Sequence, residues 1–185
     1  MRIIAGTAKG TRLGPVPAGT RPVSDRAREG LFASLGARVE AARVLDLFAG
    51  TGALGIEALS RGASTARFVD ASPDAVAAIR DNLARSRKEG VAQRADVLRA
   101  LRSGRGPEDP FDLVFVDPPY ETPSEDLAAC LAELDRGWLP DDGWTVIVTR
   151  GQKGSLPAVP LHWAVARQLR YGDSLLTLYR EVGWA

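Results

Sequence analysis

Short apolar runs alternate with longer amphipathic stretches between residue 43 and residue 149 of this chain. The apolar runs have the length of strands and lie at residues 43–48, 65–69, 91–95, 112–116 and 144–149. Apolar positions recur at helical spacing at residues 53–60, 72–88 and 124–134. Nearly continuous apolar strands that alternate with helices are typical of an α/β fold, in which a mostly parallel sheet is covered on both faces.

The two ends of the chain follow other patterns. Residues 1–22 are rich in Gly, Pro and Thr, which favours a small hairpin and a loop, and a helix is predicted to begin at Ser24 or Asp25. Near the C-terminus, Tyr171-Gly172-Asp173 separates two strand-like runs at 163–170 and 174–181, a spacing typical of a hairpin. We therefore predict an N-terminal extension over residues 1–40 and one α/β domain over residues 41–185.

Composition excludes several classes of protein. The 185 residues suffice for one domain with its own core, and 45% hydrophobic with 25% charged residues argues against disorder. One cysteine and one histidine exclude an internal disulfide and argue against a His/Cys metal cluster, so no metal is expected. No apolar run approaches the length of a membrane span, and the N-terminus lacks the apolar segment of a signal peptide. We expect a cytoplasmic protein.

Positive charge is concentrated at the start of the chain. Residues 1–43 carry eight basic and three acidic residues, a net charge of +5, whereas the whole chain has a net charge of +1. This asymmetry favours contact with a polyanion such as RNA, and a solvated basic surface is the alternative interpretation. The candidate RNA contacts are Arg2, Lys9, Arg12, Arg21, Arg26 and Arg28.

A glycine-rich turn follows the first strand of the predicted sheet. The residues 50–55, Gly-Thr-Gly-Ala-Leu-Gly, match G-x-G-x-x-G between a strand and a helix, where backbone N–H groups are free to meet a ligand. Taken alone, this motif also fits a nicotinamide-dependent oxidoreductase. Asp46 opposes that interpretation, because a carboxylate repels a pyrophosphate and suits a ligand that carries an ammonium and a sulfonium.

Two further aspartates end the next two predicted strands. Asp70 lies 18 residues beyond Gly52, where a carboxylate can accept hydrogen bonds from ribose hydroxyls. Asp96 ends the third strand, where it can meet an adenine amino group. Each of these residues alone is more often a turn or cap residue. Three aspartates at successive strand ends nevertheless indicate a nucleoside site at the carboxyl edge of the sheet.

The most specific motif is Asp117-Pro118-Pro119-Tyr120, after the fourth predicted strand. The prolines keep the chain extended and remove two N–H donors, so the Asp117 side chain and the Pro118 carbonyl are free to accept the two N–H groups of an exocyclic amine. Holding both donors orients the nitrogen lone pair toward an electrophile. Tyr120 offers a flat face on which an extruded base can stack. The alternative, a proline-rich loop after a buried strand, does not account for the aspartates that precede it.

With these motifs the chain resembles the class I S-adenosylmethionine-dependent methyltransferases that methylate amino groups. More narrowly, it resembles the 16S ribosomal RNA guanine-N2 methyltransferases of the RsmD type. The residues that carry the narrower resemblance are 2–6 with 9–13, 21–32, 46–52 and 117–120, together with the hairpin around Gly172. Val23 departs from the family pattern, in which a threonine is expected.

The resemblance implies a Rossmann-like class I methyltransferase fold with a seven-stranded, mostly parallel sheet and a C-terminal antiparallel hairpin. It implies methyl transfer from S-adenosylmethionine to the 2-amino group of guanine 966 in 16S rRNA, with the assembled small subunit favoured as substrate. Nothing in the sequence suggests an obligate dimer, so a monomer is expected. The expected catalytic residues are those of the Asp117-Pro118-Pro119-Tyr120 motif. The expected cofactor-binding residues are Asp46, Phe48, Gly50, Thr51, Gly52, Asp70, Ala71, Asp96 and Val97.

Three alternatives stay open at the level of the sequence. The same amine-methylating chemistry can act on DNA adenine or on a protein glutamine, although the basic N-terminal segment argues against a protein substrate. A nicotinamide-dependent oxidoreductase would share the glycine motif but needs room for a second nucleotide. A catalytically silent RNA-binding module would not need the intact motif at residues 117–120.

Overall fold

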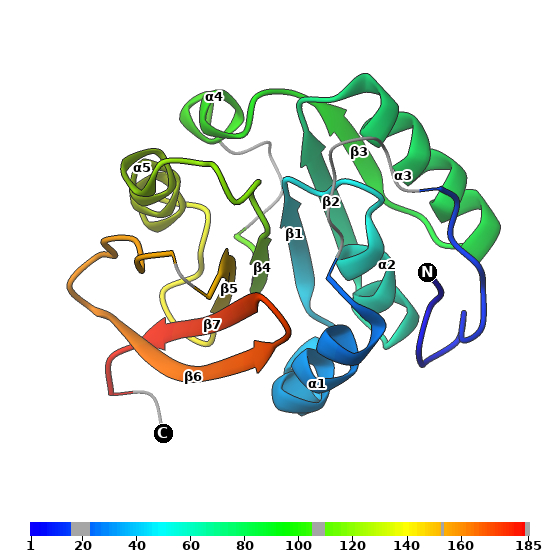
Figure 1. Cartoon of the computed structure of the whole chain (residues 1–185), viewed down its shortest axis with the longest axis horizontal. Helices are drawn as coiled ribbons and strands as arrows, with labels where there is room; N and C mark the ends of the chain where they lie inside the picture. The colour runs from blue at the N-terminus through cyan, green and yellow to red at the C-terminus, as the bar shows by residue number, and fades with distance from the viewer. Residues whose placement is uncertain (16–22, 105–109, 153, 184–185) are drawn as a thin grey trace.

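A seven-stranded sheet is the centre of the computed structural model, which describes residues 1–15, 23–104, 110–152 and 154–183 (Figure 1). The strands lie in the order β3-β2-β1-β4-β5-β7-β6. The first five in this order are parallel, and β7 is antiparallel to both of its neighbours. The strands are β1 (Arg43–Leu47), β2 (Thr65–Asp70), β3 (Val91–Arg94), β4 (Leu113–Val116), β5 (Thr145–Gly151), β6 (Trp163–Tyr171) and β7 (Ser174–Glu181).

Helices cover both faces of this sheet, because both faces of its central strands are apolar. Along β1, Val44 packs into one hydrophobic cluster, and Leu45 and Leu47 pack into a second cluster on the other face. The first cluster includes residues of α1 (Asp25–Leu35), α2 (Ala53–Ser60) and α3 (Pro73–Ser86), and the second those of α4 (Val97–Arg102) and α5 (Ser124–Asp135) (Figure 1). The predicted fold class, the mostly parallel sheet and the terminal hairpin are confirmed.

Capping serines explain why two of the helices begin where the sequence predicts. The Ser24 side chain accepts a hydrogen bond from the N–H of Ala27 at the start of α1, and Ser72 accepts one from Ala75 at the start of α3. The helix α4 and the 3₁₀ helix η1 (Gly36–Val39) were not predicted. They have six and four residues, which is too short to produce a periodic apolar pattern.

The predicted N-terminal hairpin is present but short. Arg2 and Arg12 form an antiparallel bridge, the N–H of Ile3 donates to the carbonyl of Thr11, and the N–H of Leu13 donates to the carbonyl of Met1. The reason lies in α2, where Glu57 is fully buried and accepts hydrogen bonds from the N–H groups of Ile4 and Ala5. These two donors are therefore used by a side chain instead of a partner strand. The first residues of the chain are thus attached to the helix that follows the glycine turn.

The N-terminal extension shares its core with the sheet. Ile3, Ala8 and Leu13 are buried in the same hydrophobic cluster as α1, α2 and α3. Gly6 lies so close to α2 that an added Cβ would come within 1.8 Å of the carbonyl oxygen of Ser60. This close approach and a φ of +81° require glycine at position 6. Among the described helices, none is long and apolar enough to cross a membrane.

Candidate active site

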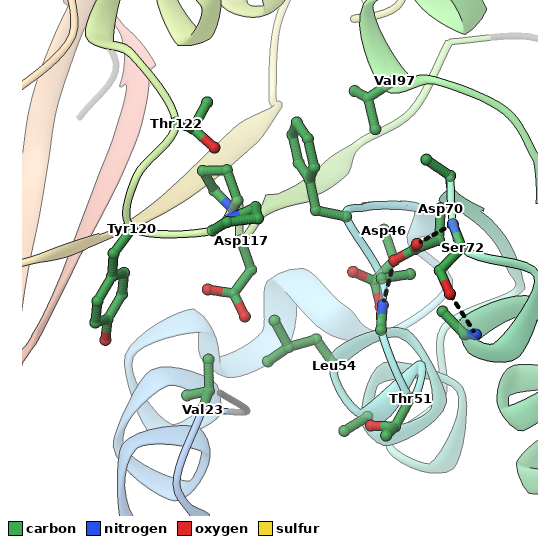
Figure 2. A pocket seen from close by; sticks show the side chains of 18 of the residues that line it. Val23, Asp46, Thr51, Leu54, Asp70, Ser72, Val97, Asp117, Tyr120 and Thr122 are labelled. Carbon is green, nitrogen blue, oxygen red and sulfur yellow. Dashed lines mark hydrogen bonds between the residues drawn. The ribbon is translucent and has the colours of Figure 1, made fainter. Parts of the chain in front are cut away.

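A cavity of about 630 Å³ opens at the carboxyl ends of β1, β2 and β4, where parallel sheets commonly bind ligands. Its wall brings together the glycine turn, the end of β2, the start of α4 and the residues after β4. Asp117 and Tyr120 lie on one side and Asp46, Asp70 and Ser72 on the other, with Leu54 and Val23 beside them (Figure 2). Four segments that are far apart in the sequence therefore form one site of a size suited to a nucleoside.

The glycine turn is held in place by carboxylates of the site. The N–H of Gly50 donates to Asp70 Oδ2 at 2.8 Å, and the N–H of Gly55 donates to Asp46 Oδ2 at 2.9 Å. Gly50 has a φ of +55°, and Phe48 adopts the same left-handed region with a φ of +57° although it carries a side chain. Such a conformation costs a non-glycine residue about 1 kcal/mol or more, and here the surrounding contacts maintain it next to the cavity.

Asp70 ends β2 and lies between two backbone donors. Besides Gly50, the N–H of Ser72 donates to Asp70 Oδ1 at 2.9 Å (Figure 2). Each carboxylate oxygen has two lone pairs, so both oxygens can still accept a hydroxyl from a ligand in the cavity. Ala71, the next residue, lines the cavity as well. The geometry is thus compatible with the predicted contact between Asp70 and a ribose.

Asp46 is almost completely buried, with an exposed fraction of 1%. Burial raises its pKa well above the ordinary value, and the negative charges of Asp117 and Asp70 raise it further, against the hydrogen bond from Gly55. A cation in the cavity would offset this burial and repulsion. The surroundings of Asp46 are thus compatible with the positively charged ligand that the sequence analysis expects there.

Asp117 follows β4 and contacts a residue that the sequence analysis did not identify. Burial raises the pKa of Asp117 to about 7, and a hydrogen bond with the side chain of Thr149 opposes this rise. Thr149 is 2% exposed on β5, the strand beside β4. The signal for it was a polar residue directly after the apolar run at residues 146–148, but its partner depends on the pairing of β4 with β5. Thr149 holds the carboxyl of Asp117 in place.

Tyr120 is held by contacts from the terminal hairpin. Its hydroxyl is 2.8 Å from the Ser174 Oγ at the start of β7. A Cβ added at Gly151 would lie 3.6 Å from Cδ2 of the Tyr120 ring, so the ring passes close to this glycine. Gly151 pairs with Ser174, which brings the turn between β6 and β7 to the carboxyl end of β5, next to the cavity. The nearby Arg150 donates from Nη1 to the carbonyl of Thr122 at 2.8 Å. These contacts order the segment that follows Pro118 and Pro119, both of which line the cavity.

The remaining predicted cofactor residues lie at the edges of the same cavity, with one exception. Asp96 caps α4 by accepting the N–H of Arg99, and it lines the cavity together with Val97, Phe48 and Thr51. Gly52 does not line it. An added Cβ at Gly52 would meet Ile79, Ile56 and Phe68 at 3.2–3.3 Å, so this glycine serves the turn and the packing beneath it.

The structure corrects the prediction for Arg28, which was expected to be a surface contact for RNA. Its side chain is fully buried and lines the cavity, because α1 turns this position toward the sheet. Four other predicted RNA contacts are exposed, namely Arg2, Lys9, Arg12 and Arg26, and Arg21 lies outside the described residues. In the described part of the chain, no three His, Cys, Asp or Glu side chains form a group that could hold a metal ion.

The strand order and the aspartate-lined cavity at the strand ends define a Rossmann-like fold of the class I methyltransferase type. A family model described as conserved hypothetical protein 95 matches residues 1–180. The chain belongs to this family, and its resemblance to the RsmD type is confirmed.

Known proteins are similar to this chain over nearly its whole length. The putative rRNA methyltransferase YlbH of Bacillus subtilis is 33% identical over 186 residues, which cover 99% of this chain and 100% of that protein. The ribosomal RNA small subunit methyltransferase D of Escherichia coli is 35% identical over 183 residues, which cover 98% of this chain and 90% of that protein. The solved structure of the putative methyltransferase yhhF from Escherichia coli superposes on this chain with a TM-score of 0.83 at 34% sequence identity. The match covers 98% of this chain and 97% of the yhhF chain.

Proposed function

We propose that this chain is an S-adenosylmethionine-dependent rRNA methyltransferase that methylates the exocyclic 2-amino group of a guanine in 16S rRNA. The observation that carries the proposal is that Asp117 and Pro118 share one cavity with Asp46 and Asp70. The relatives named as rRNA methyltransferases, one of them of the small subunit, support the RNA as substrate. Such a substrate would place the protein in the cytoplasm.

The residues present fit the proposed cofactor. Asp70 has free lone pairs for ribose hydroxyls, and the buried Asp46 suits the positively charged part of the methionine group. Asp96, Val97 and Ala71 would surround the adenine and ribose at the far end of the cavity. When bound, S-adenosylmethionine supplies an electrophilic methyl group.

The motif at residues 117–120 would hold the target amine. The carboxyl of Asp117 and the carbonyl of Pro118 would accept its two N–H groups, which leaves the nitrogen lone pair free for the reaction. Extrusion of a base from its stack costs a few kcal/mol, and stacking on Tyr120 contributes roughly 1–3 kcal/mol in return. Because Tyr120 is tied to Ser174, its ring is already positioned before the base arrives.

The charge of Asp117 would stabilise the reacting amine. The nitrogen gains positive charge as its new bond forms, and an ionised carboxylate next to it lowers the energy of the transition state. With a pKa of about 7, Asp117 can be ionised near neutral pH while its environment strongly favours a cation beside it. Asp117 would thus act mainly on the rate and much less on cofactor affinity.

The exposed cations of the N-terminal extension would contact the RNA backbone. Arg2, Lys9, Arg12 and Arg26 are all exposed at this end of the chain. Gly14 at the end of this segment is joined through Asn82 to the carbonyl of Thr51, which lines the cavity, so bound RNA would lie on the same side of the molecule as this part of the wall.

Methyl transfer from labelled S-adenosylmethionine tests the proposal directly. Undermethylated small subunits, naked 16S rRNA and DNA are incubated separately with the parent protein and with Asp117→Ala. We expect label in the 16S rRNA of subunits, at the 2-amino group of a guanine, and a loss of 10²-fold or more in Asp117→Ala with nearly unchanged cofactor affinity. Label in DNA alone, or full activity of Asp117→Ala, would overturn the proposal.

A further inference from the structure

The side chain of Arg28 is a fully buried guanidinium that is only partly satisfied. Its Nη2 donates to the carbonyl of Arg2 and to Asp25 Oδ1, both at 2.7 Å. Its Nε and Nη1 are shielded from solvent and have no hydrogen-bond partner. A guanidinium has five N–H donors, so three of them are unused. Buried donors without partners are costly and rare in native proteins, and a ligand can supply the missing acceptors.

The charges around the cavity add a second, independent argument. Arg28 is the one cationic side chain among the described residues that line it. The acidic residues in the same wall are Asp46, Asp70, Asp96, Asp117 and Glu121. An anionic group that enters this cavity is therefore repelled from most of its wall and attracted toward α1, where Arg28 lies.

The one ion-pair partner of Arg28 in the described structure does not remove this attraction. Asp25 lies at the start of α1 with 48% of its side chain exposed, so water screens its charge, whereas the Arg28 side chain has no exposed surface. Asp25 also occupies only Nη2. Asp25 therefore leaves Nε and Nη1 of Arg28 without an acceptor in the wall of the cavity.

We propose that Arg28 is the counter-charge for a ligand carboxylate, and that this carboxylate is the one on the methionine part of S-adenosylmethionine. The inference rests on the proposed function for the identity of the ligand. In this arrangement each charged end of the methionine part meets a residue of opposite charge. Asp46 faces the cationic end, and Arg28 faces the carboxylate. Arg28 is therefore a cofactor-selecting residue, not an RNA contact.

A carboxylate suits this position better than a phosphate of the RNA. The phosphate of a polynucleotide is attached to two sugars and is most easily met at the surface, where Arg2, Lys9, Arg12 and Arg26 are exposed. Arg28 lies inside the wall of a cavity that a small ligand can enter completely. The guanidinium also matches the planar shape of a carboxylate.

Calorimetry with two ligands tests the inference without any enzymatic turnover. The ligands are S-adenosylhomocysteine and its decarboxylated analogue, which keeps the amine and lacks only the carboxylate. We expect the parent protein to bind S-adenosylhomocysteine about tenfold to a hundredfold more tightly than the analogue. In Arg28→Met this preference should fall to about one, because both ligands then lack the same interaction.

Two further variants provide controls. Arg28→Lys keeps the charge and should retain part of the preference for S-adenosylhomocysteine over the analogue. If Arg28→Met does not fold, the preference of Arg28→Lys is compared with that of the parent protein instead. Arg26→Met removes the same charge from an exposed position of the same helix and should leave the ligand preference at the parental value.

Two results would overturn the inference. The first is a parent protein that binds both ligands equally, and the second is an Arg28→Met variant that keeps the full preference. If that variant also binds 16S rRNA fragments more weakly than the parent, Arg28 is assigned to a phosphate of the RNA instead. A parent protein that binds neither ligand would instead contradict the proposed function itself.

Discussion

At the scale of single residues, the site depends on carboxylates that the fold places in unfavourable surroundings. Asp46 is fully buried and Asp117 is half-buried at the same edge of the sheet, and loss of contact with water raises the pKa of both carboxyl groups. Stability alone would be better served by neutral side chains at these positions. Such a cost is typical of functional sites, and it predicts measurable effects of pH.

The substitution Asp117→Asn should stabilise the free protein at neutral and alkaline pH. The pKa of Asp117 is about 7 in the folded state and about 3.9 in the unfolded chain, so the folded state binds more protons between these values. The parent therefore loses stability as pH rises from about 4 to 7, whereas the amide does not titrate. The advantage of Asp117→Asn should grow over this range to roughly 1–3 kcal/mol and then stay constant, because residual solvent access reduces the full effect.

Urea unfolding of the parent and the variant at pH 4, 5.5 and 8 measures this difference. Other titrating groups are common to both proteins and cancel in the comparison. A difference in unfolding free energy that does not change with pH would show that Asp117 is not buried as an ionisable group.

The substitution Thr149→Val should shift the pH dependence of methyl transfer. The Thr149 side chain forms a hydrogen bond that lowers the pKa of Asp117, so its loss should raise this pKa further above 7. If the reaction needs ionised Asp117, the acidic limb of kcat/KM should move to higher pH while the rate at alkaline pH recovers. Thr149→Ser keeps the hydroxyl and should retain the parental profile. An unshifted limb in Thr149→Val would remove Thr149 from the positioning of Asp117.

At the scale of elements, α3 connects the glycine turn that lines the cavity to the N-terminal extension. Asn82 on α3 is fully buried and donates from Nδ2 to the carbonyl of Thr51 at 2.9 Å. Its Oδ1 accepts the N–H of Gly14 at 2.7 Å. One side chain therefore joins the extension to the turn that lines the cavity. The sequence pattern predicted α3 but not this link, because an asparagine in a helix gives no sign of its distant partners.

The substitution Asn82→Ala should destabilise the protein and weaken cofactor binding together. It leaves the N–H of Gly14 and the carbonyl of Thr51 without a partner, which costs about 1–3 kcal/mol for each buried group that water cannot reach. The melting temperature and the affinity for S-adenosylhomocysteine should both fall, the latter by several-fold. Arg80→Ala, an exposed position of the same helix, is the control and should change neither. Parental cofactor affinity in a destabilised Asn82→Ala would show that the link does not reach the site.

At the scale of the whole molecule, the two faces of the sheet differ in the exposed arginine side chains that could contact RNA. The extension, α1 and α2 lie on the face of the first hydrophobic cluster, and α4 and α5 lie on the other (Figure 1). The exposed Arg2 and Arg12 belong to the first face, where Arg2 Nε lies 4.0 Å from Asp25 Oδ2. Arg102 and Arg136 belong to the second face and lie 3.5 and 2.8 Å from the same oxygen of Glu133. The proposed RNA surface is therefore one-sided.

The double variant Arg2→Gln/Arg12→Gln should weaken RNA binding and reduce its dependence on salt. Each lost phosphate contact lowers the slope of log affinity against log salt by about 0.7–0.9, so the two together should lower it by about 1.5. The matched double variant Arg102→Gln/Arg136→Gln removes the same charge from the other face and should leave the slope unchanged. Both are compared by titration of a 16S rRNA fragment over a range of salt concentrations. Equal slopes in the two double variants would refute a one-sided RNA surface.

These substitutions are better tests than deletion of the extension. Ile3, Ala8 and Leu13 are part of the hydrophobic core, so their removal would leave cavities and lower stability for reasons unrelated to RNA. The basic charge of residues 1–43 was visible in the sequence, but the burial of these apolar residues was not.

The sequence by itself determined the order of the strands and of the longer helices, the glycine turn, the aspartates at the strand ends and the Asp117-Pro118-Pro119-Tyr120 motif. These are local features, since capping, apolar periodicity and the conformational limits of proline and glycine act over a few residues. Only the tertiary structure decided which partners these features meet: Thr149 for Asp117, Ser174 for Tyr120, and the cavity wall for Arg28. The physical reason is that burial and charge environment depend on segments far apart in the chain, so an arginine that the sequence assigns to the surface can face the interior once its helix is packed.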